Sequence, residues 1–287
     1  MITLLRRQAS FGRHIFPFDA PAVSPLPHDQ EAELHRIWDQ LADYDATRTE
    51  EAQLFVMREL KRLIDADDAV WVGVVRLVSG QKAEHDPQLG WRSCAVVHLE
   101  WTDLKRQVVA AAMKAQDREG GVDSSVEMAK RAGVFRTLTL RELHDMRTFV
   151  RTEHYRTCFV PFNITDRIWC VFPVNEDCEI AYILDRFGDR PGFTERDKQV
   201  LSAALRPLKW FHRGTMLAHG VMLGDKRLTP RERSLCARLL GNQTEKEIAE
   251  SLGLTLSTTR GYIKALYAKF GVQGRAGLMA LWLGANK

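Results

Sequence analysis

The sequence predicts an α+β domain over residues 29–213, with an antiparallel sheet and helices packed on it, followed by an all-α domain over residues 228–287. Three observations support this division. A chain of 287 residues has the length of two ordinary domains. Strand-like runs rich in valine and isoleucine alternate with helical patterns in the first part, whereas the last part contains helical patterns alone. The excess positive charge is confined to the last part.

The charge of the chain is divided unevenly. From Leu228 onward there are nine Lys or Arg residues and four Glu residues, a net charge of +5. The rest of the chain holds 32 basic and 33 acidic residues, so the formal charge of +4 comes from the C-terminal domain. This asymmetry predicts a polyanion as the partner of that domain.

Composition places the chain among folded globular proteins, with 45% hydrophobic and 27% charged residues. The sequence has no apolar run of the length that a membrane span needs, and none follows the early arginines as in a secretory signal. The five cysteines are scattered and form no Cys-x-x-Cys pair, so we expect reduced, mostly buried thiols in a cytoplasmic protein. A redox or metal role for Cys158, Cys170 or Cys178 is the alternative.

The first domain is expected to open with two helices, after an extended arm over residues 1–28 that contains four prolines. Apolar residues recur at helical spacing from Leu34 to Leu41 and from Leu54 to Ile64. The next predicted elements, in order, are strands over 69–78 and 91–99, helices over 103–116 and 125–131, and a short strand over 134–138.

Three strand-like runs over 157–164, 167–174 and 179–187 complete the predicted sheet. Turn-forming residues between them predict an antiparallel meander. A capping box formed by Thr194 and Asp197 then opens a long helix to about residue 213, with a kink expected at its proline. This helix either only covers its own sheet or also pairs with its twin in a homodimer, and residues 214–227 are the expected linker.

Each helix of the C-terminal domain has its own start signal. The expected N-caps are Thr229, Thr244 and Thr255. Glu232 and Glu247 stand where they complete capping boxes with the first two. Glycines end the helices or make the turn between them: Gly241, Gly253 and Gly271. Two short helices joined through a glycine turn, the second basic and free of acidic residues, describe a helix-turn-helix.

The helix predicted from Thr255 to Phe270 has the character of a DNA-reading helix. One side is apolar and is expected to be buried: Ile263, Leu266, Tyr267 and Phe270. The other side carries hydroxyl groups and cations but no carboxylate, so nothing on this helix repels phosphate. Arginine and lysine read guanine edges or neutralise backbone charge, and Gly261 permits close approach to base edges.

Collinear segments of this domain resemble the LuxR/GerE-type DNA-binding domain: 228–233 (LTPRER), 246–249 (KEIA), 252–254 (LGL) and 258–272, which ends in KFGV. The resemblance implies a four-helix domain whose third helix reads DNA. It implies base contacts by Arg260, Gly261 and Lys264. It also implies contacts with the DNA backbone by nearby polar groups, which we assign to Thr244, Ser257, Thr258, Tyr262 and Lys269.

The resemblance further implies that the fourth helix, about Arg275–Trp282, is a dimer contact. The apolar residues Leu278, Leu281 and Trp282 agree with this role. Thr259, Gly261 and Tyr262 depart from the residues common in the family, which leaves the preferred DNA sequence open.

The order of elements in the first domain resembles the GAF/PAS-like sensory fold. A phosphorylated receiver domain does not fit, because Asp67 and Asp68 precede a strand instead of following one. The acyl-homoserine-lactone branch needs a grouping of Trp, Tyr and Asp that this chain does not reproduce at the family's spacing. The aromatic residues considered were Trp38, Tyr44, Trp71, Trp91 and Trp101, with Asp45 beside Tyr44; most of them are expected in the core.

Searches for catalytic, phosphate-binding and metal-binding motifs find no match, so we expect no enzyme activity, no cofactor and no metal. His98, His144 and His154 could meet Cys158 in the fold, but isolated residues of this kind are usually structural.

The sequence therefore predicts a DNA-binding transcriptional regulator that acts as a homodimer on a two-fold-related site in double-stranded DNA. We expect a ligand or partner of the first domain to gate DNA binding. An unknown small molecule and RNA polymerase are possible further partners of the protein. No membrane partner is expected. Two alternatives stay open. The first domain only dimerises or docks another protein, or the chain is an enzyme with an appended helix-turn-helix.

Overall fold

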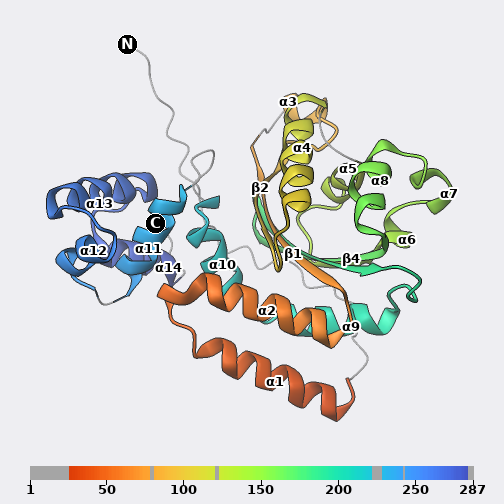
Figure 1. Ribbon diagram of the computed structural model, residues 1–287, viewed down its shortest axis with the longest axis horizontal. Coiled ribbons are helices and arrows are strands. Elements are labelled where there is room, and N and C mark those ends of the chain that lie inside the picture. The colour runs from red at the N-terminus through yellow and green to blue at the C-terminus, as the bar shows by residue number, and fades with distance from the viewer. Residues whose placement is uncertain (1–25, 78–80, 120–122, 222–227, 242, 284–287) are drawn as a thin grey trace.

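The computed structural model describes residues 26–77, 81–119, 123–221, 228–241 and 243–283, which form two lobes side by side (Figure 1). The larger lobe is the N-terminal domain, residues 26–221, and the smaller is the C-terminal domain, residues 228–283. Most of the predicted arm and part of the predicted linker lie outside the described residues, and the first helix begins at His28. Within the described ranges, every helix is too short or too polar to cross a membrane.

A five-stranded antiparallel sheet in the order β2-β1-β5-β4-β3 lies at the centre of the N-terminal domain, which confirms the predicted α+β class. Its strands are β1 (Asp68–Arg76), β2 (Trp91–His98), β3 (Arg136–Thr139), β4 (Ile164–Asn175) and β5 (Cys178–Phe187). On β1, Val72 lies opposite Val96 of β2 and Ala181 of β5. Side chains alternate between the two faces of a strand, and both faces of β1 are covered, which explains its nearly continuous run of valines.

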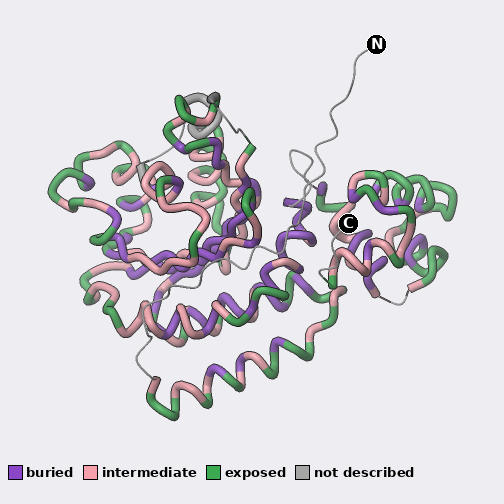
Figure 2. The backbone as a smooth tube through the Cα atoms, turned by 180° about the vertical axis from the view of Figure 1, so that it is seen from behind, coloured by how far each residue is buried: buried purple, intermediate pink, exposed green. Residues whose placement is uncertain are grey.

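One face of the sheet is covered by the four helices α1 (His28–Ala42), α2 (Thr49–Leu63), α9 (Glu195–Leu205) and α10 (Lys209–Ala218), with the short 3-10 helix η1 (Ala46–Arg48) between α1 and α2. The core on this side includes the fully buried Trp71 of β1, Tyr182 of β5 and Leu201 of α9. Figure 2 shows the sheet and the inner sides of α2 and α9 as the most continuously buried part of the molecule.

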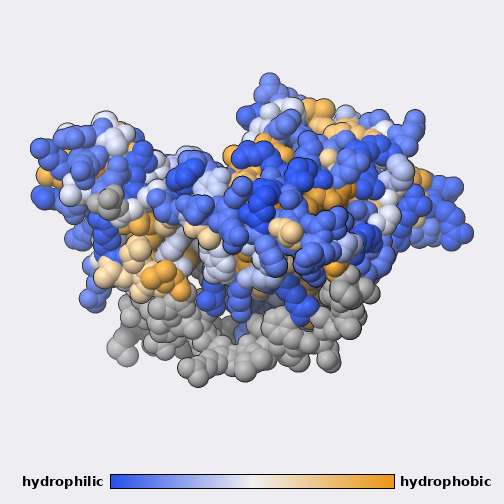
Figure 3. Space-filling model, turned by 90° about the horizontal axis from the view of Figure 1, so that it is seen from below, coloured by the Kyte–Doolittle hydropathy of each residue, from blue (hydrophilic) through white to orange (hydrophobic). Residues whose placement is uncertain are grey.

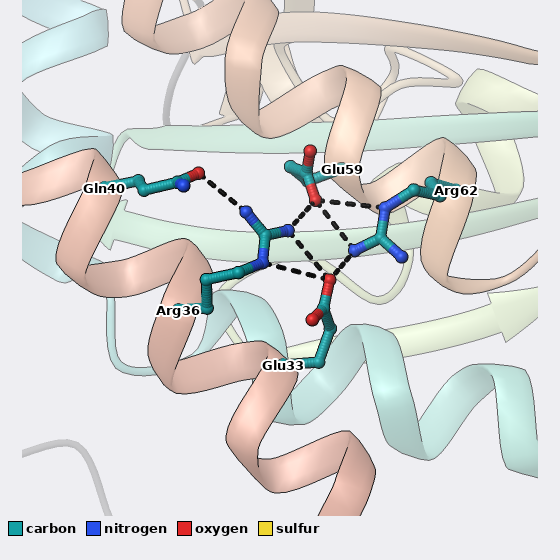
Figure 4. A network of polar contacts seen from close by, with 5 residues as sticks. All are labelled: Glu33, Arg36, Gln40, Glu59 and Arg62. Atoms are coloured by element: carbon teal, nitrogen blue, oxygen red, sulfur yellow. Dashed lines mark hydrogen bonds and ion pairs between the residues drawn. The ribbon is translucent and has the colours of Figure 1, made fainter.

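An ion-pair network ties α1 to α2 at the outer edge of this layer (Figure 4). Arg36 lies between Glu33 of its own helix and Glu59 of α2, 2.8 Å and 2.5 Å from their carboxylate oxygens. Arg62 of α2 contacts the same two carboxylates. Because each arginine contacts both carboxylates, the network fixes the register of α1 on α2. The arginines are partly exposed, so each ion pair contributes little to stability.

One long helix, α4, and several short ones cover the other face of the sheet: α3 (Gln81–Glu84), α4 (Asp103–Glu119), α5 (Asp123–Ala129), α6 (Leu140–Leu143), α7 (Met146–Phe149), α8 (Glu153–Cys158) and the 3-10 helix η2 (Val160–Phe162). The predicted strand over 157–164 is wrong. Thr152 caps α8 by accepting a hydrogen bond from the Tyr155 amide, and Pro161 stands in the first turn of η2, where it lacks the N–H that a strand ladder needs. The position next to β4 is taken by β3, with Leu138 opposite Trp169.

The long helix predicted after Thr194 is two helices, α9 and α10, separated at residues 206–208. The capping box of Thr194 with Asp197 is present. Pro207 lies in the break, because its ring and missing N–H do not allow the helical hydrogen bonds to continue. α10 then runs to Ala218, past the predicted domain boundary at residue 213 and into the predicted linker.

The C-terminal domain consists of α11 (Pro230–Leu240), α12 (Glu245–Ser251), α13 (Leu256–Phe270) and α14 (Arg275–Trp282). All three threonine N-caps are confirmed: Thr229 and Thr244 form full capping boxes, and Thr255 accepts a hydrogen bond from the Thr258 amide. The turn between α12 and α13 contains Gly253 at φ +61°, a backbone conformation that glycine adopts without strain. The domain has its own apolar core, around Ile248 and Leu266.

Candidate nucleic-acid interface and cavity

α13 is held so that one side faces the domain core and the other faces solvent. Ile263, Leu266 and Phe270 are buried, and so is Thr259, whose hydroxyl donates to the Thr255 carbonyl at 3.0 Å. The opposite side of the helix lies on the outer surface of the lobe (Figure 2). Figure 3 shows this lobe as largely hydrophilic, in keeping with its excess of cations.

The three predicted base-contacting residues lie on the exposed side of α13. Arg260, Gly261 and Lys264 are all exposed, and a side chain added at Gly261 would meet nothing within 4 Å. The Nε of Arg260 lies 2.8 Å from a carboxylate oxygen of Glu245, which stands in the first turn of α12. An acidic residue of the preceding helix therefore holds this guanidinium at the exposed surface, and DNA binding would have to replace or reorient that ion pair.

Four of the five predicted backbone-contacting residues also lie on the exposed surface: Thr244, Ser257, Thr258 and Tyr262. Thr244 is already engaged as the N-cap of α12, and the Thr258 hydroxyl lies 2.8 Å from that of Thr255. The guanidinium of Arg231 stacks over the ring of Tyr262 at 5.6 Å from its centroid, which places another cation at this surface.

Lys269 has a different environment. Its Nζ lies 2.6 Å from Glu232 in the first turn of α11, and both side chains are largely buried. Burial favours the neutral form of the Glu232 carboxyl, but hydrogen bonds from Lys269 and Thr229 outweigh it and hold its pKa below the usual value. Lys269 thus joins the end of α13 to the start of α11.

The predicted dimer contacts on α14 face their own chain. Leu278 is 2% exposed and belongs to the core of the C-terminal domain. Trp282 lies against α10, where a Cβ added at Gly214 would come within 3.2 Å of its ring. Leu281 is half-buried beside the same core.

The N-terminal domain contains two adjoining cavities between its sheet and the helices α4, α5 and α8. Their volumes are about 150 Å³ and 170 Å³. Val72 and Val74 of β1 line the first cavity on its sheet side, and the second cavity lies between the sheet and α4. Both are lined by Arg167 and His154, so these two residues mark the junction.

Two buried ion pairs border the cavities. Arg136 makes two 2.9 Å contacts with Glu179, and Arg167 makes contacts of 2.5 Å and 2.8 Å with Asp185. Within the part of the chain that is described, the Nε of Arg136 is buried without a hydrogen-bond partner. Buried charge is costly unless it is paired, and the two contacts with Glu179 supply that pairing at this end of the first cavity.

A second polar group lies on the wall of the first cavity. The Ser124 hydroxyl is 3.1 Å from the Nε2 atoms of both His144 and His154. Burial and the nearby Arg167 lower the pKa of His154 to about 3, so this imidazole is neutral at physiological pH. Of the residues grouped from sequence, His98, His154 and Cys158 do line the second cavity together, whereas His144 lies outside its lining and shares the Ser124 hydroxyl with His154.

The surroundings of two of the three cysteines considered argue against a redox role. Burial raises the pKa of Cys170 and of Cys178 to about 12, which keeps both as unreactive thiols. Among the described residues, no three His, Cys, Asp or Glu side chains gather as a metal site.

Sequence reasoning missed the polar lining of the cavities. Arg167 and Glu179 stand inside runs that were recognised as strands, and a charged residue in an otherwise buried strand is a signal that could have found them. Arg136 stands in the predicted strand 134–138 and carried the same signal, whereas Ser124 carried none. Of the aromatic residues considered, Trp71 is core, Trp91 lines the first cavity and Trp101 is partly exposed.

Comparison with known proteins identifies the C-terminal domain. Residues 226–281 match the family model described as bacterial regulatory proteins, luxR family. The chain is 38% identical over 64 residues to the transcriptional regulatory protein MctR of Rhizobium johnstonii, covering 22% of this chain and 30% of MctR. It is 37% identical over 57 residues to the probable HTH-type transcriptional regulator GfsR of Streptomyces halstedii, covering 20% of this chain and 24% of GfsR. The match thus spans less than a third of either relative.

Among solved structures, the VqsR LBD domain from Pseudomonas aeruginosa superposes with a TM-score of 0.43 at 12% identity, over 66% of this chain and 98% of that one. Escherichia coli SdiA superposes with a TM-score of 0.41 at 13% identity, over 89% of this chain and 98% of that one. The family model and both sequence relatives describe regulators, in line with the expectation that the chain is not an enzyme. Residues 226–281 are therefore a helix-turn-helix domain of the luxR family of bacterial regulatory proteins.

Proposed function

We propose that the protein is a cytoplasmic transcriptional regulator that binds a two-fold-related site in double-stranded DNA as a homodimer. The observation that carries this proposal is the exposed side of α13, where Arg260, Gly261 and Lys264 lie together on a helix without carboxylates. Cations at such positions read guanine edges in the major groove or neutralise phosphates. The exposed hydroxyl groups of Ser257 and Thr258 at the start of the helix suit backbone contacts.

We further propose that a small molecule in the N-terminal cavities gates DNA binding. An apolar floor with a few buried polar groups at its edge is the usual make-up of a ligand site. The Arg136–Glu179 ion pair, the Ser124 hydroxyl and the neutral His154 imidazole supply that polar edge. The two cavities together suit an elongated ligand with a hydrogen-bonding group, and the likeness of the domain to GAF/PAS-like sensors stays a prediction.

The test is retention of fragmented genomic DNA by the purified full-length protein at several salt concentrations, followed by sequencing. We expect enrichment of a pseudo-palindromic sequence whose retention falls as salt rises. Arg260→Ala should reduce the enrichment. Arg147→Ala is the matched control, because it removes an equal charge from a 91% exposed side chain of the N-terminal domain. Salt-sensitive retention without any enriched sequence would contradict sequence-specific regulation.

A further inference from the structure

α10 is shared between the two domains. Phe211 and Met216 on this helix belong to the core of the N-terminal domain, packed beneath the sheet. Leu217, the next residue, belongs instead to the core of the C-terminal domain, together with Leu235 and Leu278. A single helix therefore contributes to two cores, and neither core is complete without it.

The side of α10 that faces the N-terminal domain packs directly on β1. The other face of this strand lines the first cavity. A Cβ added at Gly73 of β1 would come within 3.1 Å of the Met216 Sδ and 3.3 Å of Val221 Cγ2. The neighbouring Val72 and Val74 point to the opposite face of β1 and line the cavity. Only the thickness of one strand separates the cavity from α10.

The residue after α10 is held by a polar contact with α2 and by ring stacking on the sheet. His219, directly after the helix, has its Nε2 2.9 Å from the Gln53 side-chain oxygen of α2. Its ring stacks on Trp71 of β1 at a centroid distance of 4.9 Å. A shift of β1 would therefore be felt at both Met216 and His219.

The opposite side of α10 meets the C-terminal domain at close range. Trp282 of α14 lies on Gly214, which leaves no room for a larger side chain. A second close contact joins η1 to the end of α11, where a Cβ added at Gly241 would come within 2.5 Å of the Thr47 Cγ2. Between these two contacts the domains touch more loosely: Arg233 lies 3.5 Å from Glu50, and a space of about 330 Å³ remains between α2 and α11. In Figure 1, α10 stands between the sheet and the C-terminal helices. Of the closely packed parts of the interface, α10 is the one that also lies against the sheet.

We propose that α10 couples the two domains, so that the state of the cavity controls the C-terminal domain through β1 and α10. Because Leu217 is part of the C-terminal core, any displacement of α10 changes both the stability and the orientation of the DNA-binding domain. A flexible tether between independent domains would have neither effect. The last step, control of DNA binding, rests on the function proposed above.

The coupling can be tested without DNA by hydrogen exchange resolved along the chain. Leu217→Ala should speed amide exchange in α11 and α14 by about tenfold or more, while β4 and β5 keep their protection. The matched control is Trp210→Ala on the same helix, whose side chain is 54% exposed and lies outside the C-terminal core; it should leave exchange in α11 and α14 unchanged. Gly214→Val, which forces Trp282 away, should reproduce the effect if Leu217→Ala does not fold. Unchanged exchange in folded Leu217→Ala and Gly214→Val proteins would overturn the proposal.

A double-mutant cycle tests the path from the cavity. Ala181→Leu fills part of the first cavity from β5 and should change the affinity for the retained DNA severalfold in the wild-type background. In the Leu217→Ala background the same substitution should change it by less than about twofold. Equal changes in both backgrounds, or no change in either, would show that the cavity does not act through α10. If no variant retains specific DNA, the proposed function fails, whereas the exchange experiment still decides the coupling.

Discussion

Below about pH 6.5 the protein should lose stability because of a histidine buried in α10. His212 has no exposed surface, and its ring lies 4.7 Å and 5.9 Å from those of Phe172 and Tyr182. Its Nε2 is 2.9 Å from the Leu205 carbonyl oxygen, and in the described part of the chain its Nδ1 has no partner. Burial lowers the pKa of His212 to about 4, although the hydrogen bond to Leu205 opposes the change.

The direction of the pH effect follows from which state binds the proton. The unfolded chain takes up a proton near pH 6.5 and the folded protein only near pH 4, so the neutral folded form is fully stable above pH 6.5 and loses stability as the pH falls toward 4. At pH 5, about 1.5 pH units below the unfolded value, the loss is about 2 kcal/mol. His219 and His154, whose pKa values are lowered to about 4 and about 3, should add losses of the same sign.

The measurement is urea unfolding followed by circular dichroism between pH 7.5 and pH 5, a range in which ordinary carboxylates stay ionised. His212→Gln is the informative variant, because the glutamine amide can still donate to the Leu205 carbonyl but does not titrate. The wild-type free energy of unfolding should fall across this range by about 2 kcal/mol more than that of His212→Gln. Equal pH slopes for the two proteins would refute the reasoning, since they would mean that His212 is protonated inside the fold at its ordinary pKa.

Three further substitutions have defined expectations. Arg260→Ala should weaken specific DNA binding by about 1–3 kcal/mol in a titration with the enriched sequence, and unchanged affinity and selectivity would remove Arg260 from the reading surface. Lys269→Ala should lower the free energy of unfolding by up to about 1 kcal/mol and leave the salt dependence of DNA binding unchanged, because its ammonium is held by Glu232; a flatter salt dependence would instead assign Lys269 to a phosphate. Glu179→Gln should cost about 3 kcal/mol in guanidinium unfolding, since it leaves Arg136 buried and unpaired; a stability equal to wild type would mean that this ion pair is dispensable.

The C-terminal domain could be predicted closely because its signals are local. Thr229, Thr244 and Thr255 each cap a helix through groups two or three residues away, so neighbouring residues alone decide where α11, α12 and α13 begin. The buried side of α13 follows from the spacing of Ile263, Leu266 and Phe270. The exposure of Arg260 and Lys264 follows from the same periodicity.

The N-terminal domain was less predictable where two local structures compete for the same residues. Residues 157–164 contain enough β-branched and aromatic residues to suggest a strand, yet the Thr152 cap and Pro161 make them helical. The edge of the sheet is completed instead by β3, whose pairing with β4 joins residues 29 to 35 positions apart. Such long-range pairings leave no trace in a local pattern.

By itself the sequence determined the two domain classes, the positions of most helices and strands, and the exposed cationic side of α13, because each depends on residues close together along the chain. Only the tertiary structure decided that Arg136 and Glu179 meet at the edge of a cavity, that Lys269 is bound by Glu232, and that Trp282 lies on Gly214 of α10. It also placed α10 in both cores. These contacts join segments far apart in sequence, and they form only when the burial of apolar surface brings the whole chain together.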